Sequence, residues 1–563
     1  MSVQGQSQLA GKESRGALFA ILLALLICGA AGILSIRLGP DNNWDLRFYH
    51  LYAAWAYLHG RYLYDIGPAQ AQSYFNPTAD LLFYALTSSP LNNAPRIIAF
   101  IMGAVHGINA VLTLAIALHV LRPVEPVERL VLCALALLMG VSGAGGISLL
   151  GTTTNDLTEA IFVLGSLLGI LRFAAAAHAR HSWRTLAWSG LSAGIGIGLK
   201  YTAAIFLPGL CLIALIAAVR RSAVHALVGF AVATTIGFLL IAGHHLLTLW
   251  RIFGNPVFPL FNHIFQSPYF EPQAIRDNRF VVRDLGQLLG YPFYWARTNI
   301  YLVSELAFRD WRGAIAYVSI FAGAIKYIAS RVAGHRLLAR GETRGLRLVV
   351  IFVVTSYLTW CVGFGIYRYA VALEMLTGIV SMGALIWLCE DRRLRLVVAM
   401  AVFAIAELTT VYPDWGRGAN PSAGIRPARY GDKYVDVRVP ALPANSLVLI
   451  PTPEPVAYFI PFATPSARYL GIENNFLNLS QSNDLADEVK RLMRKPGAPK
   501  FVVNVGEFNS DRLNGLLGRF GLRLGGGFCE PIRSNLEEHA LSLCRVSAAA
   551  GRTDATSSPL TPR

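Results

Sequence analysis

Acidic residues suited to proton transfer follow the first long apolar segment of the chain. Asp41 and Asp45 occur in the stretch GPDNNWDLRFYH, which ends at His50. A carboxylate at such a boundary can act as a general base that takes a proton from an acceptor hydroxyl, and a nearby histidine can assist it. The alternative is structural, because aspartate is a favoured N-cap residue and Asp45 precedes an expected helix.

A second acidic pair, Asp156 and Glu159, occurs in the stretch GTTTNDLTEA before another apolar segment. Side chains with this spacing lie on one face of a helix, so the two carboxylates could orient an acceptor or hold a divalent metal. The alternative is a capping-box-like helix start, in which the acidic groups bond to the first backbone amides. The sequence leaves both interpretations open.

Basic residues occur at similar boundaries. Lys200 lies in GLKYTA between two short apolar segments, Arg368 lies in GIYRYAVALEML, and Arg251 follows another apolar segment. Such cations can bind the phosphate of a lipid carrier, and arginine can do so with two parallel hydrogen bonds. Alternatively, Lys200 extends its apolar stem along the membrane, and Arg368 belongs to an aromatic belt with Tyr367 and Tyr369.

The elements that must position these residues are predicted to be membrane helices. The 563-residue chain is 54% hydrophobic and 15% charged, whereas soluble domains carry about 25% charged residues. Its apolar residues come in runs of roughly 20, the length that crosses the hydrocarbon core of a bilayer. The clearest runs are residues 17–36, 97–121, 130–150, 224–248, 347–366 and 370–389. This pattern excludes a soluble globular protein.

The formal net charge of +16 is also explained by a membrane location. Lysine and arginine concentrate in short segments between apolar runs, as the positive-inside rule predicts, so we expect membrane lipid and no nucleic acid as a partner. The rule predicts about eleven helices, a cytoplasmic N-terminus and an extracytoplasmic C-terminal domain. Two short helices within 186–219, turning near Lys200, leave the exact count open.

The predicted order of domains places every candidate residue on one side of the membrane. Residues 1–16 are expected to be a disordered cytoplasmic N-terminus, and 17–411 an all-α transmembrane domain with outer loops at 37–95 and 249–311. The second loop contains GNPVFP, whose prolines favour an extended, turning backbone. It is expected to form a lid or wall over a site, or else a surface loop that contacts no substrate.

The chain changes character in residues 412–546, where proline, glycine, asparagine and aspartate become frequent. We expect a small extracytoplasmic α/β domain there. An oxidising compartment would allow Cys529 and Cys544 to form a disulfide, and the alternative is two free thiols. Residues 547–563 are predicted to be a disordered tail. The expected strands are 446–451, 501–505 and 541–546, and the expected helix is 484–495.

With these motifs in order, the chain resembles the GT-C superfamily of multi-pass membrane glycosyltransferases. It is most similar to the family 87-like and protein mannosyltransferase-like groups, which depend on polyprenyl-phosphate sugars. Asp45, Asp156, the GLKYTA turn, and GNPVFP followed by IYRY carry the resemblance, which spans roughly residues 17–411.

The resemblance implies a plasma membrane enzyme, in a bacterium the inner membrane, that moves a sugar from polyprenyl phosphate to a hydroxyl of a lipid, glycan or protein acceptor. Asp45 would be the base in an inverting reaction, and Lys200 and Arg368 would hold the donor phosphate. Protein mannosyltransferases have adjacent Asp-Glu in the first loop, where this chain has Asp45-Leu46. This departure, and the lack of a clear set of metal ligands, argue against a required metal, and a divalent metal stays possible as a cofactor.

Two other functions compete with this one. An O-antigen ligase or polymerase-like enzyme would use a pyrophosphate-linked glycan and favour basic residues in one outer loop. A transporter or flippase would need charged residues along a path through the membrane, and the predicted helix centres are nearly free of charge. The residues that keep the ligase open are His244, His245, Arg276, Arg279 and Arg283.

Overall fold

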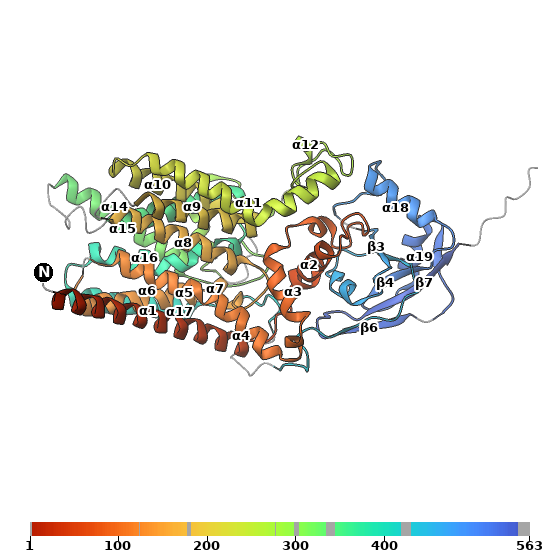
Figure 1. Cartoon of the computed structure of the whole chain (residues 1–563), viewed down its shortest axis with the longest axis horizontal. Coiled ribbons are helices and arrows are strands. Elements are labelled where there is room, and N and C mark those ends of the chain that lie inside the picture. Colours follow the sequence, from red (N-terminus) through yellow and green to blue (C-terminus); the bar gives the residue numbers. More distant parts are fainter. Residues whose placement is uncertain are drawn as a thin grey trace, which may run out of the picture. The chain divides into compact units, whose positions relative to one another are not determined.

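The chain folds into two compact units. The computed structural model describes residues 3–122, 124–176, 182–275, 277–297, 303–333, 344–417, 429–473, 475–527 and 529–549 (Figure 1). The first unit comprises 1–46, 78–248 and 276–434, and the second comprises 47–77, 249–275 and 435–563. The second unit thus contains part of each predicted outer loop together with the C-terminal region.

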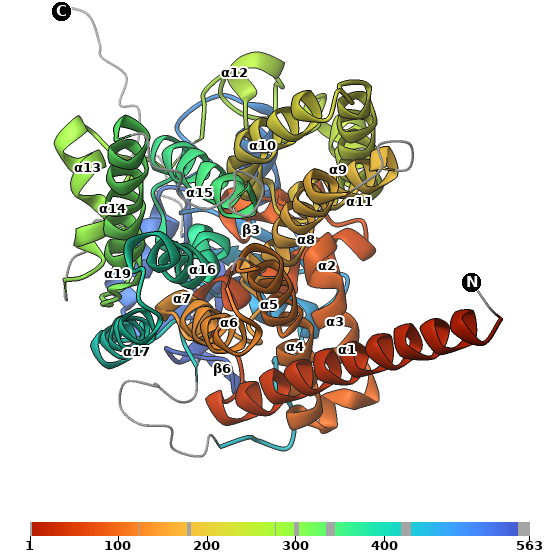
Figure 2. The same ribbon diagram turned by 90° about the vertical axis from the view of Figure 1, so that its left-hand side faces the viewer.

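The first unit is helical (Figure 2). Its long helices are α1 (Val3–Leu38), α4 (Pro95–His106), α5 (Ile108–Val120), α6 (Pro126–Val141), α8 (Asp156–Ala175), α9 (Ser182–Leu199), α10 (Leu207–Arg220), α11 (His225–Phe253), α14 (Arg312–Val332), α15 (Arg344–Gly363), α16 (Val371–Leu388) and α17 (Arg392–Thr409). Short elements connect them: η3 (Thr78–Asp80), α3 (Leu81–Thr87), η4 (Pro90–Asn93), α7 (Ala144–Ser148), η5 (Tyr201–Phe206), α13 (Leu285–Tyr294) and η6 (Tyr367–Ala370).

Eight helical stretches among the described residues are long and apolar enough to cross a membrane. They are Arg15–Leu38, Pro95–Val120, Asp156–Ala175, Tyr201–Arg220, His225–Phe253, Arg312–Ser330, Arg344–Gly363 and Tyr367–Leu388. The predicted fold class, a multi-span helical domain followed by a small α/β domain, is confirmed. The other three predicted spans also form helices, α6, α9 and α17, and their crossing of the membrane stays a prediction.

The structure differs from the sequence prediction at some helix boundaries. Helix α1 begins at Val3, so most of the segment predicted to be disordered continues the first membrane helix. That segment contains glutamine, alanine, lysine and glutamate, which favour helix, and it contains no proline. The predicted span 97–121 is divided at Gly107 into α4 and α5, and 130–150 is divided at Ser142 and Gly143 into α6 and α7.

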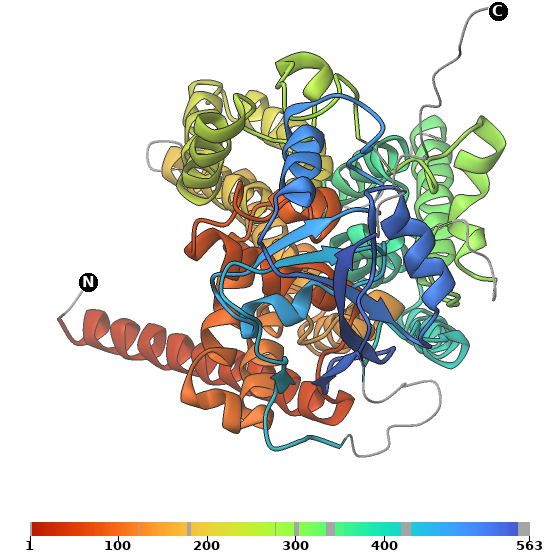
Figure 3. The same cartoon turned by 90° about the vertical axis from the view of Figure 1, so that its right-hand side faces the viewer.

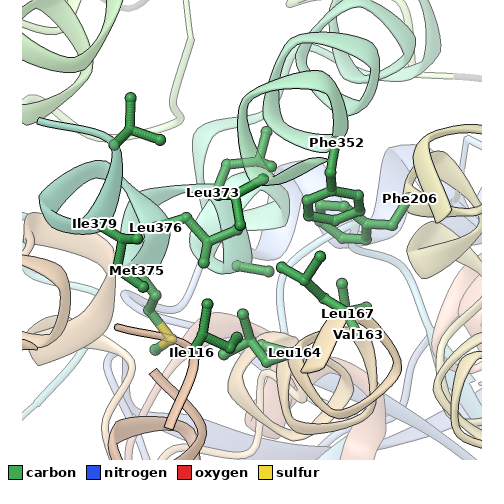
Figure 4. Close-up of a cluster of buried hydrophobic side chains, with 14 of the residues drawn as sticks. Ile116, Val163, Leu164, Leu167, Phe206, Phe352, Leu373, Met375, Leu376 and Ile379 are labelled. Carbon is green, nitrogen blue, oxygen red and sulfur yellow. The ribbon is translucent and has the colours of Figure 1, made fainter. Parts of the chain in front are cut away.

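Helix α16 is the centre of the first unit. It packs against α6, α14 and α15 (Figure 2), and apolar side chains such as Leu167, Phe352 and Leu376 meet around it (Figure 4). Glycine allows α6 to approach it closely, because a Cβ on Gly140 would lie 2.4 Å from the carbonyl oxygen of Met375. A helix that is apolar on all sides is typical of a protein core or of a membrane span.

The second unit is built on a seven-stranded mixed sheet (Figure 3). The strand order is β1-β6-β7-β4-β2-β3, and β5 pairs with β7; only the pairs of β2 with β3 and with β4 are parallel. The predicted strands are confirmed as β2, β4 and β7, and the predicted helix as α18. The strands are β1 (Val437–Arg438), β2 (Leu447–Ile450), β3 (Arg468–Gly471), β4 (Lys500–Val505), β5 (Leu522–Leu524), β6 (Glu530–Ser534) and β7 (Leu541–Ala548).

The remaining helices of this unit are short. They are η1 (Leu46–His50, whose first residue belongs to the first unit), α2 (Leu51–Leu58), η2 (Gln70–Tyr74), α12 (Asn262–Phe265), η8 (Ala457–Phe462), α18 (Asp484–Arg494) and α19 (Ser510–Gly518). The predicted tail lies outside the described residues from position 550 onward, and β7 includes its first two positions.

Part of the first predicted outer loop covers one edge of this sheet. Ile66 pairs with Leu470 of β3, and the guanidinium of Arg61 binds Asp65 at 2.8 Å. Asp65 also accepts a hydrogen bond from the Tyr469 amide at 3.0 Å. Burial raises the pKa of the Asp65 carboxyl, and the bonds from Arg61 and Tyr469 only partly offset this. The loop protects an edge strand that would otherwise expose unpaired backbone groups.

A disulfide joins Cys529 to Cys544, so of the two open alternatives the structure has the bridge. Glu530 of β6 pairs with Leu543 of β7, which places the two cysteines opposite each other at one end of this strand pair. Bridges of this kind stabilise chiefly by restricting the unfolded chain.

Replacing both cysteines by alanine is expected to lower the stability of the second unit. A closed loop of this length contributes about 3 kcal/mol. The urea midpoint for proteolysis of the full protein in detergent, followed with an antibody against the C-terminal region, measures the loss. Cys211→Ala is the control, because Cys211 is an exposed free cysteine. Equal midpoints for the double variant and the control would contradict the expectation.

Candidate functional site

Four residues from distant parts of the first unit meet in one ionic cluster: Asp45, Asp156, Lys200 and Arg368. Arg368 Nη1 lies 2.5 Å from Asp45 Oδ2 and 4.0 Å from Asp156 Oδ2. Lys200 Nζ donates to Asp156 Oδ1 and, at 2.8 Å, to the carbonyl oxygen of Thr154. The side chains are largely buried, with exposed fractions of 0% for Asp156 and 13% for Arg368. The sequence predicted these residues separately, and the fold brings them together.

Asp156, Lys200 and Arg368 lie at the ends of apolar helical stretches, and Asp45 lies in the segment that follows α1. Asp45 immediately precedes η1, Asp156 begins α8, Lys200 precedes η5, and Arg368 lies in η6 before α16. Because charged side chains are costly within hydrocarbon, the ends of membrane helices are where a polar site can form. Helix packing then determines which ends come together.

The structure also decides between the alternatives for individual residues. Asn155 occupies the N-cap position of α8, while Asp156 bonds to Lys200 and Glu159 accepts from Thr202 Oγ1 at 3.2 Å. The two carboxylates therefore face other side chains and do not form the capping box. The aromatic interpretation of Arg368 holds in part, because its guanidinium carbon lies 5.3 Å from the centroid of the Tyr369 ring.

Tyr369 and Glu305 surround the ionic cluster and were not predicted from the sequence. Lys200 Nζ lies 4.8 Å from the centroid of the Tyr369 ring, so this ring contacts both cations. Glu305 Oε1 lies 3.9 Å from Arg368 Nε. Both residues were visible in the sequence, Tyr369 next to Arg368 and Glu305 in the long outer loop. However, no spacing pattern linked Glu305 to Arg368.

Several buried polar atoms in this site lack a hydrogen-bond partner within the described part of the chain. They are Arg368 Nε and one carboxylate oxygen each of Asp156, Glu159 and Glu305. Buried polar groups in folded proteins are nearly always paired, so such a group of atoms marks a place where a polar ligand can bind. The site offers both cations for an anion and carboxylate oxygens for hydroxyl groups.

A second ion pair lies close to the ionic cluster. Arg279 Nη2 lies 2.7 Å from Asp277 Oδ2. Burial alone would raise the pKa of Asp277, but the hydrogen bonds and charge of Arg279 outweigh it and lower that pKa, and Arg368 adds to the effect. The bond to Asp277 raises the pKa of Arg279, with smaller contributions from Glu305 and Tyr369. The segment that carries this pair therefore lies within electrostatic range of the cluster.

Asp41 lies outside the ionic cluster, although the sequence suggested a catalytic role for it. One carboxylate oxygen accepts from the amide and hydroxyl of Thr153, both at 2.8 Å. The other accepts from the amide and side chain of Asn43 at 3.1 and 2.7 Å. Asp41 is fully buried. It joins the segment that carries Asp45 to the loop before Asp156, and its role in catalysis stays a prediction.

The loop before α8 has a further anchor that the sequence did not reveal. Asn155 adopts a left-handed backbone conformation with φ of 65°, and its side-chain amide donates to Asp80 Oδ1 at 2.7 Å. Asparagine tolerates this conformation better than most residues. The two anchors, Asp41 on Thr153 and Asp80 on Asn155, hold the backbone on either side of Thr154, which accepts from Lys200.

Two predicted residues, His50 and Arg251, belong to the second unit and not to the unit that holds the ionic cluster. His50 is buried, with its ring centroid 4.1 Å from that of Tyr49. Arg251 is exposed near the C-terminal end of α11. Their predicted roles in catalytic support and phosphate binding stay predictions.

Those basic residues suited to a ligase that the structure describes do not share one partner. His244 Nε2 lies 2.9 Å from Thr78 Oγ1, His245 is buried, and Arg279 pairs with Asp277. Arg283 is exposed, and Arg276 lies outside the described residues. Among the described residues, no three or more His, Cys, Asp or Glu side chains are placed to hold a metal ion. The metal dependence stays a prediction.

Comparisons with known proteins give similarity in fold alone. No protein-family model matches the chain, and no curated protein matches it. ArnT from Cupriavidus metallidurans in the apo state aligns with 13% identity and a TM-score of 0.49, covering 95% of this chain and 98% of that one. Its structure bound to undecaprenyl phosphate aligns with 12% identity and a TM-score of 0.47, covering 94% and 98%. The Archaeoglobus fulgidus oligosaccharyltransferase in the apo form aligns with 12% identity and a TM-score of 0.43, covering 89% and 71%.

Proposed function

We propose that this protein transfers a sugar from a polyprenyl-phosphate carrier to an acceptor hydroxyl at the outer face of the plasma membrane. The observation that supports the proposal is the ionic cluster of Asp45, Asp156, Lys200 and Arg368 at the ends of membrane helices. A lipid-linked phosphate reaches such a site with its tail in the hydrocarbon and its head group at the helix ends.

The cations bind and stabilise the donor phosphate. Arg368 has an unbonded Nε and a guanidinium that can hold two phosphate oxygens, and Lys200 adds a second positive charge. Negative charge develops on the phosphate as its bond to the sugar breaks. Fixed cations at that position stabilise the transition state in a site where little water competes.

Asp45 acts as the general base in this proposal. Its carboxylate accepts the proton of the acceptor hydroxyl while the acceptor oxygen attacks the anomeric carbon of the sugar. The bond from that carbon to the phosphate oxygen breaks, and polyprenyl phosphate leaves with the electron pair. Because one displacement occurs at the anomeric carbon, the reaction inverts its configuration.

Assays in membranes that contain the protein test this function. We expect transfer from at least one radiolabelled polyprenyl-monophosphate sugar, with the inverted configuration in the product. The matched control is Glu390→Gln, because Glu390 is 86% exposed in a pair with Lys326 at 3.4 Å and lies away from the cluster. This variant should keep the full rate. Transfer from a pyrophosphate-linked glycan alone would favour the ligase, and no transfer from any donor would favour a transporter.

A further inference from the structure

The glycine-rich stretch Gly143–Gly146 surrounds a buried carboxylate of α16. Glu374 is 3% exposed, and its two oxygens accept hydrogen bonds from the amides of Gly146 at 2.7 Å and Gly145 at 3.0 Å. A Cβ on Gly143 would lie 2.1 Å from Glu374 Oε1, so a larger residue cannot stand there without displacing the carboxylate. The glycines therefore allow the backbone to bind this carboxylate.

The same carboxylate binds the segment that carries Arg368. The Tyr367 hydroxyl donates to Glu374 Oε2, and the Tyr367 amide donates to the carbonyl oxygen of Val303 at 2.6 Å. The indole of Trp360 donates to the carbonyl oxygen of Ile366 at 2.7 Å. The peptide bond between Ile366 and Tyr367 is thus held at its carbonyl oxygen and at its amide, directly before Arg368.

A second carboxylate supports the glycine-rich stretch. Asp310 Oδ2 accepts from the Ala144 amide at 2.9 Å, and Arg312 Nη1 lies 3.0 Å from both oxygens of Asp310. Arg312 also donates to the carbonyl oxygen of Met139 at 2.6 Å, at the end of α6. Buried polar groups are nearly always hydrogen-bonded, and here every oxygen of Glu374 and Asp310 has a donor.

The glycine-rich stretch leads directly toward Asp156. It enters α7, and α7 is followed by the loop in which Thr153 bonds to Asp41 and Asn155 bonds to Asp80. One carboxylate, Glu374, therefore connects the backbone that carries Arg368 to the backbone that leads to Asp156. The Arg368 and Asp156 side chains themselves lie 4.0 Å apart.

We propose that Glu374 and Tyr367 are positioning residues that hold Arg368 at its distance from Asp156, with Gly145 and Gly146 as backbone donors to Glu374 and Gly143 as the residue whose lack of a Cβ leaves room for the carboxylate. We name these five residues the glycine clamp. The clamp does not touch the substrate, and it acts through Arg368. The expected effect of the clamp on sugar transfer rests on the proposed function. Its expected effect on the protection of backbone amides does not depend on that function.

Hydrogen exchange tests the clamp without any enzymatic assay. Tyr367→Phe removes one hydroxyl, and we expect amide exchange to become about tenfold faster in peptides covering both η6 and α7. Ser381→Ala is the matched control, since it removes a buried hydroxyl that does not contact Glu374. The Ser381 hydroxyl lies in α16 and donates to the carbonyl oxygen of Thr377 at 2.8 Å. Unchanged exchange at α7 in Tyr367→Phe would overturn the clamp.

A double-mutant cycle tests whether the clamp acts through Arg368. Tyr367→Phe should lower kcat/KM for transfer about tenfold in the native background but less than about twofold in the Arg368→Lys background. Equal losses in both backgrounds would overturn the positioning role. If the native protein transfers from no monophosphate donor, the proposed function fails, and the exchange experiment alone decides whether the clamp exists.

Discussion

Asp45→Asn is expected to lower the rate of sugar transfer by about 10²- to 10⁴-fold while the protein still folds and binds its donor. Asparagine has nearly the same shape and keeps an oxygen that can accept from Arg368. It cannot take a proton from the acceptor hydroxyl, so the variant loses the proposed base and little else. The rate is measured at saturating donor in membranes, with the amount of protein matched by immunoblot.

Two further variants of acidic residues complete this test. Asp45→Glu keeps a carboxylate but moves it by one methylene, so an intermediate rate is expected, and Glu390→Gln should retain the native rate. A general-base role also predicts that Asp45→Asn leaves the KM for the donor nearly unchanged. If Asp45→Asn kept more than about half of the native rate, Asp45 would not be the base.

Arg368→Ala is expected to lower kcat/KM for the donor by about 10²- to 10³-fold, because it removes a cation aimed at the leaving phosphate. Arg368 is also the shared partner of Asp45, Asp156 and Glu305, at 2.5, 4.0 and 3.9 Å. Without it, three carboxylates lose a common counter-charge, so the alanine variant is also expected to be less stable. Thermal melting in detergent measures that second effect.

Arg368→Lys separates phosphate binding from stability. Lysine retains the charge but cannot make two parallel hydrogen bonds, so we expect nearly native melting and about a tenfold loss of kcat/KM. Arg283→Ala is the control, because Arg283 is an exposed arginine in the predicted loop 249–311 and should keep native kinetics. A lysine variant with native kinetics, or an alanine variant that loses only stability, would show that Arg368 has a structural role alone.

The membrane architecture could be predicted from the sequence because it depends on local properties. Hydrocarbon excludes charge, so long apolar runs must form helices and charged residues must collect at their ends. This reasoning located the helices and the ionic residues at helix ends, among them Lys200 and Arg368. Strands of the C-terminal domain were recognised where they are apolar and continuous, as in β4. The short strands β1 and β5 carry too few residues for a pattern.

The pairing of those residues could not be predicted in the same way. Arg368 and Asp45 are separated by 323 positions, and nothing in either local stretch indicates the other. The same holds for Asp41, which looked like a second base, although its oxygens hold Thr153 and Asn43. A carboxylate has the same local sequence signature whether it accepts a proton, binds a cation or holds a loop, and only its neighbours distinguish these roles.

Glu374 shows most clearly which contacts could not be predicted from the sequence. In the sequence it is one acidic residue at the start of an apolar helix, and Gly143–Gly146 lies within the apolar run 130–150. In the structure the glycine amides bind that carboxylate. The sequence by itself determined which segments enter the membrane and which side chains remain at helix ends, because solvation acts on each segment separately. Only the tertiary structure decided which charged groups meet, because that depends on close packing between helices far apart in the chain.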